Sequence, residues 1–90
     1  MATTVRIPTQ LRPLANGASE LTVEGVTVGE VLKALDAEYP GFGERLFDDA
    51  GNLRRFVNVF LGEEDVRFLE GLDTPVGGQS LSIVPAVAGG

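Results

Sequence analysis

One segment of the chain has the residue spacing of an amphipathic helix, and it stands among segments patterned as strands. Four apolar residues recur at three- and four-residue intervals and would form a single stripe: Val28, Val31, Leu32 and Leu35. Thr27 and Glu30 have the spacing of a capping box, in which two side chains satisfy free amides at a helix start. Tyr39-Pro40-Gly41 ends the pattern. With only one main helix, the chain fits neither a repeating βαβ fold nor an all-β meander.

Strand patterns lie on both sides of this helix. Polar and apolar side chains alternate in three segments: Thr3 to Ile7, Glu20 to Glu24 and Ser80 to Pro85. Phe56 to Leu61 is β-branched and aromatic and is a candidate for a central strand. A loop containing Asn16-Gly17, a hairpin signal, is expected to join the first two as an antiparallel pair. A short helical turn is expected at Gly43 to Phe47, an extended piece at Val66-Arg67-Phe68, and a tight or 3₁₀ turn at Leu72 to Val76. The sequence therefore predicts an α+β domain, with one main helix packed on one face of a mixed sheet of four to five strands.

Length and charge limit the organisation and the partners. Ninety residues are enough for one domain with one modest core. The net charge of −6 would repel a phosphate backbone or an anionic lipid surface, so neither nucleic acid nor a membrane is expected as a partner. A protein partner with a basic docking surface is favoured, although many ordinary soluble proteins are equally acidic. We find no membrane span or signal peptide pattern, and we expect a cytoplasmic protein that is monomeric when free.

The chain contains no cysteine and no histidine. It therefore lacks a thiolate nucleophile, the usual general base and the commonest metal ligand. Two groups of neighbouring carboxylates, Asp48-Asp49 and Glu63-Glu64-Asp65, stand beside glycines and are interpreted as solvated turns rather than catalytic or calcium sites. We expect no metal site.

The last residues are unusual because no side chain from Ser80 to Gly90 carries a charge. Two terminal glycines cost much backbone entropy to order, so we expect residues 86–90 to form a flexible tail after a domain of residues 1–85. Such a tail can thread a narrow channel and present the Gly90 carboxylate to a partner. For an arbitrary chain ending in two glycines, a frayed terminus is the competing interpretation.

The segment from Ile83 to Gly90 resembles the terminal signature of the ThiS/MoaD-type sulfur carriers, which have the ubiquitin-like β-grasp fold. Further segments resemble the helix start, the third strand and the regions after it in this family: Thr27 to Leu32, Leu53 to Phe60, Glu64 to Arg67 and Gly71 to Val76. The likeness is greatest to the CysO-type carriers of actinobacteria. Leu61-Gly62-Glu63 and Gly78-Gln79 depart from the family pattern, which leaves the branch open.

This resemblance implies a function for the tail. An E1-like enzyme would use ATP to adenylate the Gly90 carboxylate, and a sulfur source would convert it to a thiocarboxylate. A biosynthetic enzyme would then accept the sulfur, with cysteine or a sulfur-containing secondary metabolite as the product, and a metalloprotease is a further partner that the resemblance suggests. The carrier would be a protein co-substrate, neither an enzyme nor the holder of a cofactor. The alternatives are a small subunit of molybdopterin synthase and a ubiquitin-like protein modifier.

Several residues are candidates for partner contact. The tail residues Ala86, Val87, Ala88 and Gly89 would lie in the partner's channel. Phe56 and Phe60 would form an exposed apolar patch if they face away from the helix; alternatively they lie beneath it, with Val57 and Val59 outside. Arg67 either contacts an acidic partner surface or pairs with a nearby carboxylate, and the pair is favoured.

Overall fold

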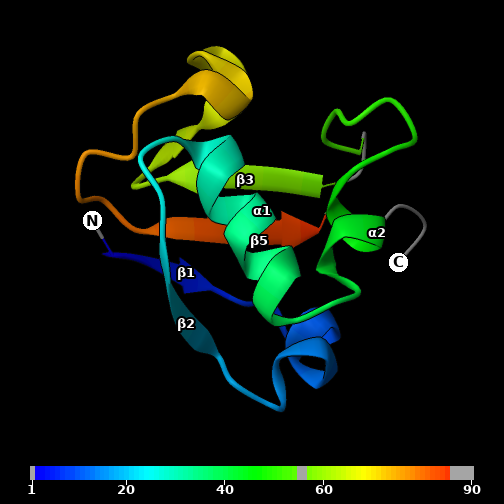
Figure 1. Cartoon of the computed structure of the whole chain (residues 1–90). Helices are drawn as coiled ribbons and strands as arrows, with labels where there is room; N and C mark the ends of the chain where they lie inside the picture. Colours follow the sequence, from blue (N-terminus) through cyan, green and yellow to red (C-terminus); the bar gives the residue numbers. More distant parts are fainter. Residues whose placement is uncertain (1, 55–56, 86–90) are drawn as a thin grey trace.

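The computed structural model describes residues 2–54 and 57–85. The order of elements follows the predicted one, with short 3₁₀ helices (η) in three connections (Figure 1). The elements are β1 (Ala2–Arg6), η1 (Thr9–Ala15), β2 (Glu20–Glu24), α1 (Val28–Glu38), α2 (Phe42–Leu46), β3 (Val57–Leu61), β4 (Glu64–Asp65), η2 (Val66–Phe68), η3 (Gly71–Asp73) and β5 (Leu81–Pro85).

The strands form one mixed sheet in the order β2-β1-β5-β3-β4. β1 and β5 are parallel, with Val5 opposite Leu81 and Arg6 opposite Ser82, and the other neighbouring strands are antiparallel. The last strand therefore occupies the centre of the sheet. Figure 1 shows α1 lying across one face of this sheet, over β5 and β3. The predicted α+β architecture is confirmed.

The start of α1 has the predicted cap. The Glu30 amide donates a 3.2 Å hydrogen bond to Thr27 Oγ1. The Glu30 carboxylate accepts a 3.1 Å bond from the amide of Val26, the residue before the cap, rather than from Thr27 itself. The Thr27 side chain thus satisfies a free amide of the first helical turn, and the Glu30 side chain satisfies an amide just before the cap.

The core lies between α1 and the sheet. All four residues of the helical stripe are completely buried. They pack with alternate residues of the central strands, which are also buried: Val57, Val59, Leu61, Leu81 and Ile83. Because side chains alternate across a strand, the remaining residues of β3 and β5 point to the face without a helix, which we call the open face.

The extended piece predicted at Val66-Arg67-Phe68 is wrong. Extended structure is confined to Glu64–Asp65, and the next three residues form η2. The Asp65 carboxylate accepts a 2.9 Å hydrogen bond from the Arg67 amide, so it caps a helical turn where the strand would otherwise continue. The apolar residues Val66 and Phe68 suggested a strand, but the local side-chain bond determines the backbone.

The first connection also differs from the expected loop because it contains η1. Asn16 and Gly17 both have positive φ angles, 56° and 86°, and they end η1. The Gly17 amide donates a 2.7 Å bond to the Arg12 carbonyl. The expected antiparallel pairing of β1 with β2 is nevertheless confirmed, with Val5 opposite Leu21.

The predicted turn at Gly43 to Phe47 is the short helix α2, whose Phe42 and Leu46 are completely buried. Tyr39 and Phe42 make an edge-to-face contact, with ring centroids 6.4 Å apart, where α1 leads into α2. Of the helices in the described ranges, none combines the length and the apolar character that a bilayer crossing requires.

Candidate functional site

The strand that leads to the predicted tail is held on both sides. β5 pairs with β1 on one edge and with β3 on the other, where Val59 is opposite Ile83 and Val57 is opposite Pro85. Leu81 and Ile83 fix it to the core. The position of β5 is therefore fixed as far as Pro85, its last residue. The tail residues Ala86, Val87, Ala88, Gly89 and Gly90 lie outside the described residues, and their roles stay predictions.

Phe60 lies on the open face. Its neighbours Val59 and Leu61 are buried under α1, whereas Phe60 is half-buried and is not among the apolar residues that pack against the core. The alternative with Phe60 beneath the helix and Val59 outside is wrong. Phe56 lies outside the described residues. A docking role for either phenylalanine stays a prediction.

The register aligns one row of side chains across the open face. Arg6 is opposite Glu20 on one side and Ser82 on the other, and Phe60 is opposite both Ser82 and Asp65. Directly opposed residues point to the same face of a sheet. The row thus combines one exposed cation, one aromatic ring and carboxylates at the two edges.

Arg67 has intramolecular partners, but they differ from the favoured carboxylate. Its Nη1 donates a 2.8 Å hydrogen bond to Asn58 Oδ1, and its Nη2 donates a 2.6 Å bond to the Arg54 carbonyl. The favoured ion pair is therefore wrong for the described part of the chain. The guanidinium instead ties η2 to the segment that enters β3. A contact between Arg67 and a partner stays a prediction.

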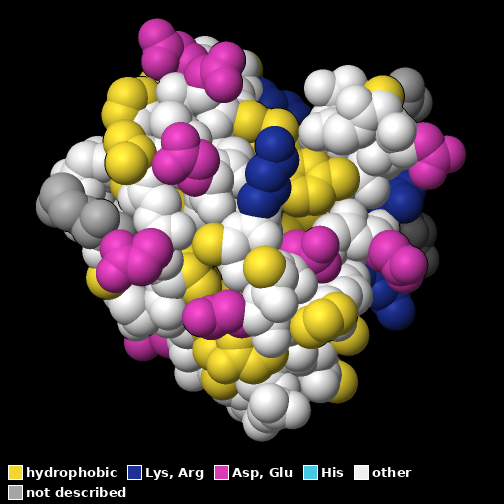
Figure 2. Space-filling view, in the orientation of Figure 1, with side chains coloured by type: hydrophobic (Ala, Val, Ile, Leu, Met, Phe, Trp, Pro, Cys, Tyr) yellow, Lys and Arg dark blue, Asp and Glu magenta, His cyan; other side chains and the backbone are white. Residues whose placement is uncertain are grey.

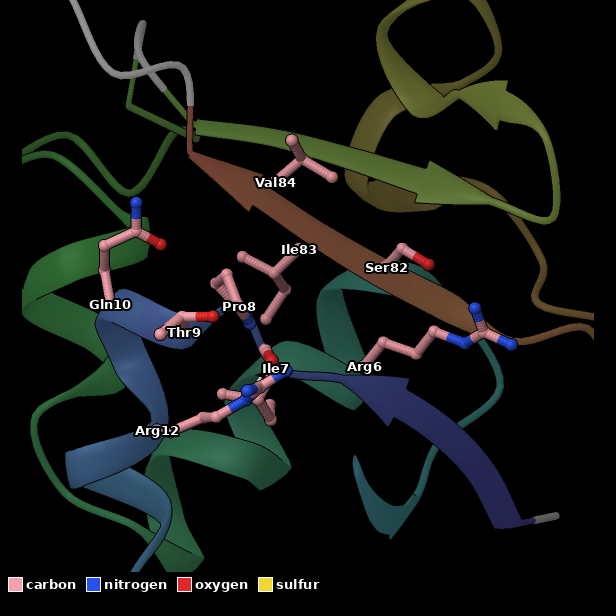
Figure 3. Close-up of a pocket in the computed structure, with 9 residues that line it drawn as sticks. All are labelled: Arg6, Ile7, Pro8, Thr9, Gln10, Arg12, Ser82, Ile83 and Val84. Atoms are coloured by element: carbon pink, nitrogen blue, oxygen red, sulfur yellow. Dashed lines mark hydrogen bonds between the residues drawn. The ribbon is translucent and has the colours of Figure 1, made fainter. Parts of the chain in front are cut away.

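A groove beside the end of β5 was not predicted. The residues that line the groove come from the end of β1, from η1 and from β5 (Figure 3). The groove has a volume of about 370 Å³. Its two charged residues are Arg6 and Arg12. The sequence around these two arginines did not indicate a site, because Arg6 is one polar position in a predicted strand and Arg12 lies in a predicted loop. They meet β5 only through its parallel pairing with β1.

The two groups of neighbouring carboxylates lie in or beside turns, and the second group ends at the start of a short helix. The Asp48 carboxylate accepts hydrogen bonds of 2.9 Å and 3.1 Å from the amides of Ala50 and Asn52, and Asp65 caps η2. Asp49, Glu63 and Glu64 are exposed. Within residues 2–54 and 57–85, no cluster of three or more potential metal-ligating side chains is formed.

Comparisons with known proteins agree with this arrangement. The chain matches the ThiS family over residues 5–90. The chain belongs to the ThiS family. This membership confirms the resemblance on which the functional expectations depend.

Among the relatives of this ThiS-family chain is the sulfur carrier protein CysO of Mycobacterium tuberculosis (strain H37Rv), which is 48% identical over 93 residues and covers all of both chains. A chain in the crystal structure of the Amycolatopsis orientalis BexX/CysO complex is 42% identical, with a TM-score of 0.90 over 98% of this chain and 99% of that one. Small archaeal modifier protein 3 of Haloferax volcanii is 41% identical over 68 residues, which cover 74% of this chain and 73% of its own. The prediction of a CysO-like, ubiquitin-like sulfur carrier is confirmed.

Proposed function

We propose that this ThiS-family protein carries sulfur as a thiocarboxylate at Gly90, and that an E1-like enzyme prepares it by adenylation. The observation that supports this chemistry is the family match, which extends through Gly90. The identity to the carrier CysO likewise spans the whole chain.

Two steps would convert the carboxylate. First, a carboxylate oxygen attacks the α-phosphorus of ATP, so that an acyl-adenylate forms and pyrophosphate leaves. Then sulfide attacks the carbonyl carbon, the new C–S bond replaces the bond to oxygen, and AMP leaves. With a persulfide donor, a thiol must then reduce the S–S bond to release the thiocarboxylate.

The composition of the chain agrees with a carrier that is not itself an enzyme. The ionised thiocarboxylate is a soft nucleophile and needs no side-chain base on the carrier. With no cysteine in the sequence, no thiol of the carrier can intercept the acyl-adenylate. We therefore assign the bases, the ATP site and the sulfur source to the partner enzymes, and no bound cofactor or metal to the carrier.

The acceptor would be a biosynthetic enzyme, with cysteine or a sulfur-containing secondary metabolite as the product. The CysO of Amycolatopsis orientalis forms a crystallised complex with BexX, which supports stable recognition of such carriers by a second protein. A metalloprotease that releases the product would complete the cycle. We place all these steps in the cytoplasm, with the free carrier as a monomer.

Intact-mass measurement tests the proposal. The protein is incubated with an E1-like enzyme of proven activity on a CysO-type carrier, with ATP and sulfide. We expect a mass gain equal to the difference between one sulfur and one oxygen atom, and none in a control shortened to Gly89. An unchanged mass of the full chain would refute the proposal.

Protein modification is a second candidate, favoured by the likeness to small archaeal modifier protein 3. In that case Gly90 would form isopeptide bonds, and digests of cell extract would contain Gly-Gly remnants on target lysines. Self-conjugation through a lysine would be restricted to Lys33, the single lysine of the sequence, which is exposed on α1. The molybdopterin synthase alternative stays a prediction, and stable co-purification with a larger catalytic subunit would support it.

A further inference from the structure

The groove beside the end of β5 is lined in part by the strand that leads to the predicted tail. One wall is the segment from Arg6 to Arg12, and the other is Ser82 to Val84 of β5 (Figure 3). Val84 immediately precedes Pro85, the last residue of the strand. Any protein that binds in this groove therefore lies beside the last residues of β5.

The charge of the groove is opposite to that of the chain. The net charge is −6, yet the described residues that line the groove include two arginines and no carboxylate. By contrast, Figure 2 shows acidic side chains spread over the face that carries α1. An acidic segment would be attracted to the groove and repelled by much of the remaining surface.

Both arginines have donors available for a ligand. Arg12 is half-buried, and its Nε donates a 3.2 Å bond to the Ile7 carbonyl, which orients the side chain. Residues 2–54 and 57–85 provide no hydrogen-bond partner for its two terminal nitrogens. Arg6 faces Glu20 with 3.6 Å between Nε and Oε2, and both side chains are more than half exposed. An ion pair of this length and exposure is weak and can be exchanged for a better one.

We propose that this groove binds an acidic segment of the E1-like activating enzyme, with carboxylates placed on Arg6 and Arg12. This inference rests on the function proposed for Gly90. Arginine presents paired N–H groups that fit a carboxylate, and such contacts fix orientation as well as position. Charged contacts at the edge of an interface mainly accelerate association, which suits a carrier that binds and leaves in every cycle.

Steady-state adenylation kinetics test the assignment, with the carrier as the varied substrate and pyrophosphate release as the signal. For Arg6→Glu/Arg12→Glu we expect KM to rise by about tenfold and kcat to change by less than about twofold, since docking rather than chemistry is impaired. Added salt should raise the KM of the unchanged protein more than that of the variant. Arg45→Glu makes the same kind of charge change at an exposed residue of α2, outside the groove, and should leave KM near its original value.

Three further variants separate charge from folding. Arg12→Lys keeps the charge but loses the paired N–H groups, so it should raise KM less than Arg12→Gln, which loses both. Glu20→Gln removes the competitor for Arg6 and should lower KM by about twofold. If Arg6→Glu/Arg12→Glu does not fold, Arg6→Glu and Glu20→Gln decide the question, because they change only exposed side chains.

The two proposals fail in different ways. If the unchanged protein gains no sulfur, the function proposed for Gly90 fails. If it gains sulfur but the charge reversals leave KM like that of Arg45→Glu, or lower kcat alone, the acidic-segment proposal is wrong and the carrier function stands.

Discussion

Arg67 and Asn58 are joined by a 2.8 Å hydrogen bond between Nη1 and Oδ1, across the boundary between η2 and β3. The same guanidinium also holds the Arg54 carbonyl, which accepts the amide of Val57 at the start of β3. Since β3 pairs with β5, this arginine helps to fix the strand against which the last strand is registered.

Arg67→Ala should therefore lower the free energy of unfolding by about 1 kcal/mol, because two exposed hydrogen bonds are lost. Chemical denaturation measures the effect, and a double-mutant cycle with Asn58→Ala should give a coupling of at least about 0.5 kcal/mol. Arg45→Ala is the control, with an expected change within about 0.5 kcal/mol. If Arg67→Ala raises KM for adenylation without loss of stability, the residue acts in docking rather than in holding β3.

Replacing each of the two buried threonines by valine should change the free energy of unfolding in opposite directions. Thr3 Oγ1 is buried without a hydrogen-bond partner among the described residues, whereas Thr74 Oγ1 accepts a 2.9 Å bond from the Glu70 amide. Thr3→Val should stabilise the protein by about 1 kcal/mol, and Thr74→Val should destabilise it by about 1–2 kcal/mol. Thermal and denaturant unfolding of both variants check this. Destabilisation by Thr3→Val would show that its hydroxyl has a partner.

The cap of α1 gives a third prediction. Thr27→Ala removes the acceptor of the Glu30 amide and should cost about 1 kcal/mol of unfolding free energy. Thr27→Ser keeps the hydroxyl and should be close to the original in denaturant unfolding. Equal losses in both variants would assign the effect to the methyl group of Thr27 instead.

Phe60 gives a fourth prediction, about docking. Because it does not pack against the core, Phe60→Ser should change stability by no more than about 1 kcal/mol. If the open face docks on the activating enzyme, the same variant should raise KM for adenylation severalfold. Phe68→Ser is the matched control, since Phe68 is 84% exposed on η2 and should not affect KM. Equal KM values for the two variants would remove Phe60 from the docking surface.

Local patterns in the sequence predicted the main elements because each has its own chemical signal. Thr27 and Glu30 mark the helix start, and the alternation of Val57, Val59 and Leu61 marks the strand β3, although only the structure shows that this face is the buried one. These signals involve residues that are close in the chain, so no knowledge of the topology is needed.

The predictions that failed did so for one of two reasons. Either two local signals in the sequence competed, or the contact joins residues that are far apart in the sequence. At Val66–Phe68 an apolar pattern favoured a strand, but the Asp65 cap determined a turn. The partners of Arg67 are Asn58 and the Arg54 carbonyl, which only the folded chain brings within reach. The groove with Arg6 and Arg12 requires β1 and β5 to be parallel neighbours, which strand patterns alone do not specify.

The parallel pairing of β1 with β5 also has a practical consequence. Because the two strands run in the same direction, Ala2 begins β1 at the end of the sheet opposite to the one where β5 finishes at Pro85 (Figure 1). An affinity tag, a fluorophore or a surface tether attached ahead of β1 therefore starts from the end of the sheet remote from Pro85. Immobilised or labelled carrier prepared in this way can be presented to its enzymes with the glycine end unobstructed.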